Sequence, residues 1–383
     1  MTALMKVLRV LHLASFRGNI GDLANHAGAR HLLGEGLGFT LEFTELEIRE
    51  FYWKKRAFDD AFIDYANTFD LMIIGGGNYF ELWVEQSATG TSIDITVQRL
   101  GRLTVPTVFF ALGVDTGQGY SQQSVQRFSA FINTVLECPH MFVCVRNDGS
   151  HLALREVLGD KVAEQILIMP DGGFFADANN LSPAIDSGYL GINLAGDMLE
   201  RRFSRDLSVD GFLREFAMSL QVLMDARIDL HINFMPHIWR DCALVAQLLP
   251  HFSDVHLRSR VVIGSLNPTR AGLATFLESY RNCDLVLGTR FHANVCPMGM
   301  MVPTRGLLNY PQVSHLYEEL GLQHRLIDIR KSGFANSLVD GVLSDLNDLG
   351  TQRKIYSDLI VTLHDQAVKT LGELRSWLNN NLK

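Results

Sequence analysis

The chain lacks any hydrophobic run long enough to cross a membrane. A helical span needs about 20 consecutive apolar residues, whereas charged and polar residues break the apolar runs of these 383 residues at shorter intervals. Lys6 and Arg9 interrupt the N-terminal stretch that could otherwise act as a signal peptide, so a first buried strand explains it better. We expect a soluble, cytoplasmic protein without stable membrane insertion.

Cysteine is scarce and scattered. An odd number of cysteines, with no C-x-x-C spacing, argues against a disulfide framework and against a structural zinc site. We therefore expect a reduced protein without a bound metal. The five cysteines are Cys138, Cys144, Cys242, Cys283 and Cys296.

Positive charge is also in short supply. The chain has 34 Lys and Arg against 42 Asp and Glu, which gives a formal net charge of −8 and leaves no basic block. Proteins that bind nucleic acid normally present clustered cations, so a nucleic-acid partner is not expected. An anionic ligand would have to be held by a few individually placed cations.

The common nucleotide and hydrolase motifs are missing as well. The only G-x-G-like run, at 34–38, follows a predicted helix rather than a strand, which is typical of a helix end. The chain contains no P-loop, no G-x-S-x-G turn and no H-E-x-x-H pair. We expect no dinucleotide or other cofactor.

What the chain does contain is a regular alternation of short apolar runs with amphipathic stretches. With 47% apolar residues and this length, it can form two domains. Alternation of this kind predicts β-α-β units around parallel sheets. The predicted strands are 7–14, 70–76, 105–113, 141–147 and 166–171, then, after a polar linker at 175–188, 189–196, 227–236, 254–259, 283–288 and 302–309.

We therefore predict an α/β fold with two Rossmann-like parallel-sheet domains facing a cleft. The expected ranges are 1–178 for the first domain, 179–345 for the second, and 346–383 for a long helix packed on the body. Parallel sheets bind ligands beyond the carboxyl ends of their strands, so residues at those ends are the candidates for a site.

In the first half, polar residues and glycines follow the strands. The turn after the first strand contains Asn19, Gly21 and Asp22, where exposed backbone N–H groups could hold a ligand or simply form a capped β-α turn. Glycines 75–77 and Asn78 follow the second strand, and three glycines suggest a close backbone approach. Arg146 and Asp171 end two later strands, either as ligand groups or as each other's ion-pair partner.

In the second half, one strand end is especially informative. The strand 283–288 leads into Arg290 and His292 at the start of a small-residue helix. An arginine can bind a carboxylate or phosphate with two hydrogen bonds, and a histidine can transfer a proton near neutral pH. His237 follows another strand and is a secondary candidate.

Taken in order, these motifs resemble the polysaccharide pyruvyl transferase family. The resemblance rests on 18–22, 70–77, Val145-Arg146-Asn147 with Ser150, Pro170-Asp171, and 284–292, with a continuation to Gly299, Val302-Pro303 and Tyr310. The chain departs from the family's pattern at Ala293 and after Tyr310, where no lysine follows closely.

This resemblance implies a GT-B-like fold and a metal-independent transfer of pyruvate from phosphoenolpyruvate to a sugar, as a ketal. It implies that Arg290 and Arg146 hold the anionic donor and that His292 acts as general acid or stabilises the departing phosphate. It implies that the first domain, with Asn19, Asp22 and the loop 75–78, faces the saccharide acceptor. The full substrate-binding set is Arg146, Asn19, Gly21, Asp22, Gly76, Gly77, Asn78, Asp171, His237, Asn309 and Tyr310.

Two other functions fit the same residues. A GT-B-like glycosyltransferase would use the arginine and histidine to hold the diphosphate of a nucleotide sugar. A non-catalytic glycan-binding relative would retain the fold alone, although the joint presence of Arg290 and His292 argues for an enzyme. The sequence leaves open whether the acceptor is free, polymeric or lipid-linked, and leaves open the oligomeric state.

Overall fold

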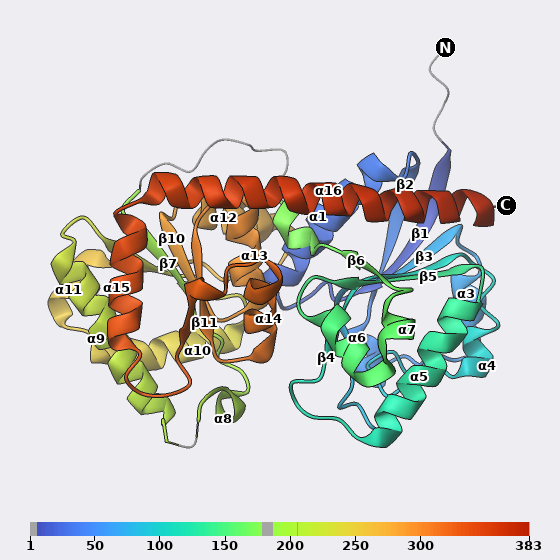
Figure 1. Ribbon diagram of the computed structural model, residues 1–383, viewed down its shortest axis with the longest axis horizontal. Helices are drawn as coiled ribbons and strands as arrows, with labels where there is room; N and C mark the ends of the chain where they lie inside the picture. Colours follow the sequence, from blue (N-terminus) through green and yellow to red (C-terminus); the bar gives the residue numbers. More distant parts are fainter. Residues whose placement is uncertain (1–5, 178–186, 205, 383) are drawn as a thin grey trace, which may run out of the picture. The chain divides into compact units, whose positions relative to one another are not determined.

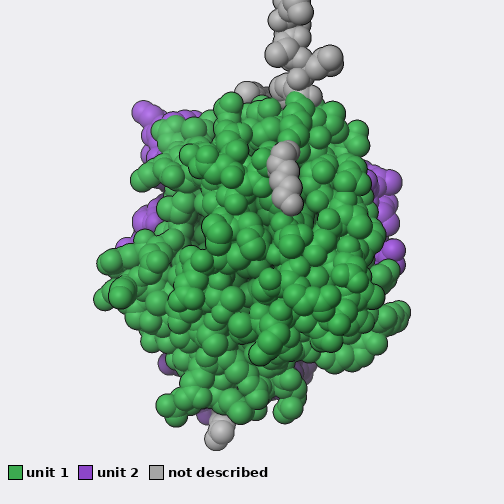
Figure 2. All heavy atoms as spheres, turned by 90° about the vertical axis from the view of Figure 1, so that its right-hand side faces the viewer, with its two compact units in different colours: residues 1–16, 29–172, 363–383 green, residues 17–28, 173–362 purple. Residues whose placement is uncertain are grey.

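The computed structural model describes residues 6–177, 187–204 and 206–382, which divide into two compact units (Figures 1 and 2). The first unit comprises 1–16, 29–172 and 363–383, and the second comprises 17–28 and 173–362. The segment 17–28, which the sequence assigns to the first domain, groups with the second unit because Ala24 packs with Met235 and Leu277 there. The expected linker lies mostly outside the described residues.

The first unit is built on a six-stranded parallel sheet with the order β2-β1-β3-β4-β5-β6 (Figure 1). All five strands predicted for this half are present. The sequence prediction missed the edge strand β2, which alternates polar and apolar residues as a half-buried strand does. The strands are β1 (Val7–Ala14), β2 (Thr40–Glu47), β3 (Leu71–Glu81), β4 (Thr107–Asp115), β5 (Met141–Arg146) and β6 (Leu167–Met169).

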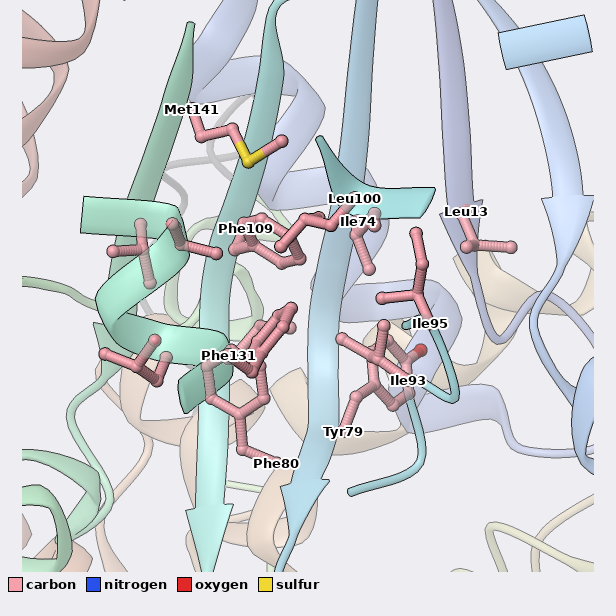
Figure 3. Close-up of a cluster of buried hydrophobic side chains, with 14 of the residues drawn as sticks. Leu13, Ile74, Tyr79, Phe80, Ile93, Ile95, Leu100, Phe109, Phe131 and Met141 are labelled. Carbon is pink, nitrogen blue, oxygen red and sulfur yellow. The ribbon is translucent and has the colours of Figure 1, made fainter. Parts of the chain in front are cut away.

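Aromatic side chains fill the core of this unit (Figure 3). Phe131, on helix α5, stands edge-on to Phe109 of β4 and Phe80 of β3, with ring centroids 5.4 and 6.0 Å apart. Each buried ring of this size stabilises the fold by roughly 2 kcal/mol. At the end of β3, the Tyr79 hydroxyl accepts a hydrogen bond from the backbone N–H of Ser15 over 2.8 Å, which ties the end of β3 to that of β1. The carboxyl ends of these strands are therefore held firmly.

The helices of the first unit connect its strands. Helix α5 begins after Ser121, whose hydroxyl accepts the N–H of Ser124. The helices are α2 (Arg49–Tyr52), α3 (Asp60–Ala66), α4 (Val97–Leu100), α5 (Gln122–Glu137), α6 (Ser150–Leu158) and α7 (Asp160–Ala163), together with the second part of α1 (Ile20–Gly36) and the last part of α16 (Leu349–Asn381).

The second unit contains another six-stranded parallel sheet, with the order β12-β11-β10-β7-β8-β9. Because the chain runs from β7 to β9 on one side and returns to β10 on the other, the strand order reverses between β7 and β10. Ligands of such sheets bind beyond the strand ends at that reversal. The strands are β7 (Tyr189–Asn193), β8 (His231–Phe234), β9 (Val261–Ile263), β10 (Leu285–Gly288), β11 (Thr304–Leu308) and β12 (Leu326–Asp328).

One predicted strand of this unit was wrong. Residues 254–259 belong to helix α11, not to a strand, because Ser253 caps the helix by accepting the N–H of His256 and because Asp254 pairs with Arg258 one turn later. The actual strand, β9, is the apolar run that follows. The short strand β12 was not predicted.

The helices of the second unit surround this sheet (Figure 1). They are α8 (Leu199–Arg202), α9 (Val209–Ala226), α10 (Trp239–Leu248), α11 (Asp254–Arg260), α12 (Arg270–Arg281), α13 (Phe291–Gly299), α14 (Pro311–Glu319) and α15 (Ala335–Leu346), with the first parts of α1 and α16. Short 3-10 turns lie at Gly172–Phe175, Leu249–His251 and Gln323–Arg325. No helix among the described residues combines the length and apolar character that a membrane span requires.

The long C-terminal helix predicted from 346 onward is confirmed as α16. Its last part packs on the first unit, where Leu371 approaches Gly36 so closely that a Cβ atom there would stand 2.8 Å from the leucine side chain. The Trp377 indole donates a hydrogen bond to the carbonyl of Pro139 over 2.8 Å. The buried stripe on the last part of α16 consists of Leu363, Ala367, Leu371, Leu374 and Leu378.

Candidate functional site

In the second unit, the ends of β7 and β10 are fastened to each other at the strand-order reversal. The hydroxyl of Thr289 accepts the N–H of Ala195 over 2.7 Å and donates to the carbonyl of Asn193 over 3.1 Å. The Asn193 side chain, fully buried, accepts the N–H of Arg290 over 3.3 Å. This network fixes the backbone from which Arg290 projects.

The Arg290 guanidinium is held by two carboxylates. Its Nε and Nη2 donate to the two oxygens of Asp241 over 2.8 and 2.5 Å, and Nη2 also donates to Asp197 over 2.6 Å. Burial alone would lower the pKa of Arg290, but Asp241 and Asp197 raise it. The arginine therefore stays charged, although in this state its charge is directed at protein carboxylates.

Asp241 is itself fixed by the backbone at the start of α10. Its oxygens accept the N–H groups of Gly196, His237 and Ile238 over 3.0, 2.9 and 3.2 Å, and its side chain is wholly buried. Although burial favours the neutral form, Arg290 and these hydrogen bonds lower the pKa of Asp241. Asp241 is therefore a permanent anion that orients Arg290.

His237 lies near Asp241, and its side chain is neutral. Its Nε2 lies 2.6 Å from the Tyr280 hydroxyl, and burial lowers the pKa of His237 to about 3. Its Nδ1 has no hydrogen-bond partner among the described residues. Because the ring carries no charge at neutral pH, His237 can take part only in hydrogen bonding.

His292, in the first turn of α13, meets the start of α1. Its Nδ1 lies 3.8 Å from the Asp22 carboxylate, which in turn accepts a hydrogen bond from the Asn19 amide over 2.9 Å. The side-chain Oδ1 of Asn19 accepts the N–H of Gly21 over 3.0 Å. Asn19, Gly21 and Asp22 therefore group with His292 in the second unit, although the sequence places them in the first domain.

Arg202, which the sequence analysis missed, connects Asn309 and Tyr310 to this group. Its Nη1 donates to the Asn309 side chain over 3.1 Å, and its guanidinium lies over the Tyr310 ring, 5.5 Å from the centroid. Its Nε donates to the backbone carbonyl of Asp197 over 2.8 Å. Both Asp197 and Arg202 follow strand β7, so the rule used for the other strand ends could have found them.

In the first unit, Arg146 is buried in an ion-paired cluster at the end of β5. Its Nη2 lies 2.6 Å from Asp148, and its Nη1 lies 3.3 Å from Asp171. The Ser150 hydroxyl donates to the other oxygen of Asp148. The structure thus shows Arg146 and Asp171 as ion-pair partners, one of the two alternatives that the sequence left open.

The glycines after β3 allow close packing inside the first sheet. A Cβ atom on Gly75, where φ is +144°, would lie 2.1 Å from the carbonyl oxygen of Phe110. Gly76 also has a positive φ, of 68°, and the register between β3 and β4 shifts just beyond it, after Gly77. The strand continues through Asn78, whose amide donates to Asp115 over 2.9 Å.

Two further carboxyl groups lie at these strand ends. Glu81 of β3 and Asp115 of β4 are direct partners across the parallel ladder, and the Ser92 hydroxyl donates to Glu81 in a very short hydrogen bond. Burial raises the pKa of Glu81 to about 7, with a further contribution from Asp115, while Arg49 acts in the opposite direction. The sequence analysis missed both carboxyl groups because it ended the two strands at 76 and 113.

Across 6–177, 187–204 and 206–382, no group of three or more His, Cys, Asp and Glu side chains is arranged to hold a metal ion.

The fold is that of GT-B glycosyltransferases, as predicted. A glycosyltransferase from Rickettsia africae matches with 11% identity and a TM-score of 0.56, covering 99% of this chain and 100% of its own. A UDP-N-acetylglucosamine 2-epimerase from Listeria monocytogenes matches with 12% identity and a TM-score of 0.53, covering 91% of this chain and 90% of its own. Identities this low show the fold alone.

A mutant O-GlcNAc transferase of Thermobaculum terrenum, at 15% identity and a TM-score of 0.45, matches 98% of this chain, which spans only 66% of that protein. No curated protein matches the chain in sequence. The model of the polysaccharide pyruvyl transferase family, however, matches residues 19–310. The chain belongs to this family, which confirms the resemblance.

Proposed function

We propose that this protein transfers a pyruvyl group from phosphoenolpyruvate to a saccharide and closes it into a ketal. The observation that carries the proposal is the placement of Arg290, His292 and Asp22 together at the strand-order reversal of the second sheet. All three lie within the stretch that the family model matches.

The reaction requires one proton donor, one anion site and a proton acceptor. A proton is added to the methylene carbon of phosphoenolpyruvate, while the oxygen of one sugar hydroxyl bonds to C2 and that hydroxyl loses its proton. The oxygen of a second hydroxyl then bonds to C2, the C2–O bond to phosphate breaks, and the proton of this hydroxyl passes to the phosphate, which leaves as inorganic phosphate. No step in this sequence uses a metal or a redox cofactor.

We assign the proton donor to His292. Its Nδ1 lies 3.8 Å from the Asp22 carboxylate, which faces the imidazole, and the N-terminus of α13 adds positive potential toward an anionic donor. Arg290 would hold a carboxylate or phosphate group of the donor. For the saccharide, we assign Asn78, Glu81 and Asp115 of the first unit, because carboxyl groups at the ends of neighbouring strands can bind and deprotonate hydroxyls.

One alternative activity has an observation in its favour. The fold matches that of a glycosyltransferase at a TM-score of 0.56, and arginines 290 and 202 could equally bind the diphosphate of a nucleotide sugar. The two activities differ in their donor, so a donor titration separates them.

Calorimetric titration of phosphoenolpyruvate at low salt, without acceptor, tests the proposal. We expect binding by the wild type and its loss in Arg290→Ala and in Arg290→Lys, which keeps a cation beside Asp241 and Asp197. Arg330→Ala is the matched control, because Arg330 pairs with an exposed aspartate elsewhere in the second unit. Binding of a nucleotide sugar in place of phosphoenolpyruvate would favour the glycosyltransferase activity.

Replacing Gly21 with alanine should impair turnover and lower the stability of the protein. The added Cβ would lie 2.7 Å from the Cβ of His292 and 2.9 Å from its Nδ1, so the start of α13 must move together with the imidazole. A displacement of about 1 Å can lower the rate about 10²-fold, and overpacking of this kind costs about 1–3 kcal/mol of stability. The measurement is the rate of phosphate release at saturating substrate.

Gly34→Ala is the control for this substitution. Gly34 lies in the same helix, and a Cβ there meets nothing within 4 Å. Equal turnover in the two variants would contradict the role given to His292.

A further inference from the structure

Two arginines of the second unit converge on one carboxylate. Nη2 of Arg290 lies 2.6 Å from Oδ1 of Asp197, and Nη2 of Arg202 lies 3.5 Å from the same oxygen. Both guanidinium groups are largely buried, with 13% and 5% of their side-chain surface exposed. Burial would raise the pKa of Asp197, but Arg290 and Arg202 lower it, so the aspartate is an anion.

The two carboxylates on Arg290 are held very differently. Asp241 accepts three backbone N–H groups and has no exposed surface, so removing it would leave several buried donors unsatisfied. Asp197 contacts Arg290 and Arg202 through one oxygen, and 20% of its side chain is exposed. Asp241 is therefore a fixed partner of Arg290, and Asp197 is an exchangeable one.

The backbone around Asp197 also favours exchange. The next residue, Met198, has a left-handed φ of 53°, which a non-glycine side chain rarely adopts. It is followed by α8, a helix of only four residues, which carries Arg202. Because Met198 is strained and α8 is short, little other than the two arginines holds Asp197 in place.

We propose that Arg202 and Arg290 form the anion-binding subsite of the second unit, and that the Asp197 carboxylate occupies this subsite until a carboxylate or phosphate group of the ligand replaces it. The inference rests on the proposed function for the identity of the donor. The charges are consistent with such an exchange. Arg290, Arg202, Asp241 and Asp197 together sum to zero, whereas departure of Asp197 leaves a net charge of +1 for an anionic ligand.

The subsite adds a cation that the motif-based assignment did not include. Arg202 would contact the same ligand group as Arg290, with Asn309 and Tyr310 supporting its guanidinium. Arginine suits this role because its planar group keeps its charge and binds oxyanions with more than one N–H.

The test is the affinity of Asp197→Asn for phosphoenolpyruvate and for inorganic phosphate, by calorimetry at low salt. Asparagine keeps the size and the backbone carbonyl that Arg202 uses, but it no longer competes as an anion. If the open subsite is populated about one time in ten in the wild type, the affinity rises about tenfold. A residue with a purely structural role would instead lower the affinity when replaced.

Three further variants complete the test. Arg202→Gln alone should bind more weakly than the wild type. The double variant Arg202→Gln with Asp197→Asn should no longer show the gain of Asp197→Asn. Asp328→Asn is the control, because Asp328 forms an exposed ion pair with Arg330 in the same unit. It should change neither the affinity for phosphoenolpyruvate nor that for phosphate. An unchanged or weaker affinity in Asp197→Asn overturns the proposal. Wild-type affinity in Arg202→Gln overturns it as well. If Asp197→Asn does not fold, the affinity of Arg202→Gln decides the matter.

The two probes separate this proposal from the proposed function. Tighter phosphate binding by Asp197→Asn, without any binding of phosphoenolpyruvate, would uphold the exchange and reject the donor. Binding of phosphoenolpyruvate by the wild type, without any gain in Asp197→Asn, would do the reverse.

Discussion

Replacing His292 with alanine should lower turnover about 10²- to 10⁴-fold, the usual contribution of a positioned general acid. Phosphoenolpyruvate affinity should change far less, because Arg290 and Arg202 remain in place. The physical reason is that alanine cannot donate the proton that the methylene carbon needs, while the Asp22 carboxylate that faces His292 cannot replace it. The measurement is kcat from phosphate release, set beside the calorimetric Kd of the same variant.

Exposed His324, in the turn Gln323–Arg325, is the control for this histidine substitution. His324→Ala should retain full turnover. Wild-type kcat in His292→Ala would remove the histidine from the mechanism, whereas a loss of donor affinity with unchanged kcat would make it a binding residue only.

Replacing Glu81 with glutamine should stabilise the protein at alkaline pH by up to about 3 kcal/mol. The folded-state pKa of Glu81 is raised from 4.5 to about 7, chiefly by burial. Between these values the folded chain keeps a proton that the unfolded chain has released. Stability therefore falls as the pH rises through this window and levels off above it. The maximal cost follows from about 1.4 kcal/mol per unit of pKa.

Urea unfolding of the intact chain at pH 4.5 and at pH 8 measures this effect. Glutamine cannot ionise and still offers an oxygen to Ser92, so Glu81→Gln should gain on the wild type only at the higher pH. The exposed Glu85, changed to glutamine, should show no such difference. Parallel pH dependence in the wild type and Glu81→Gln would show that the carboxyl group ionises normally.

Glu81→Gln also bears on the acceptor. If Glu81 accepts a proton from a sugar hydroxyl, the variant should retain donor binding but lose transfer. A pKa near neutrality suits that role, because an appreciable fraction of the side chain is then ionised and still basic.

The sequence was sufficient for the architecture because buried parallel strands are apolar along their whole length. The sequence prediction misassigned 254–259 because its four polar residues suit an exposed helix as well as an edge strand. These are Asp254, His256, Arg258 and Ser259. Strand-end logic found Arg290 and His292 because both follow a long apolar run directly.

The partners of these residues could not be read in the same way. Asp197 follows β7 and Asp241 follows β8, and both reach Arg290 only because β10, β7 and β8 are consecutive in the sheet, although their sequences are far apart. Likewise, Asp22 meets His292 because the first part of α1 packs on the second unit. Such pairings are set by tertiary packing, of which a single sequence carries no direct signal.

The division of α1 and α16 between the units has a consequence for how such proteins can diversify. The chain passes from one unit to the other four times, at 16/17, 28/29, 172/173 and 362/363. A single genetic exchange in the linker would separate Asp22 from its own His292 and Leu371 from its own Gly36. Hybrids of two family members should therefore keep their donor chemistry only when residues 17–28 are inherited together with the second half of the chain.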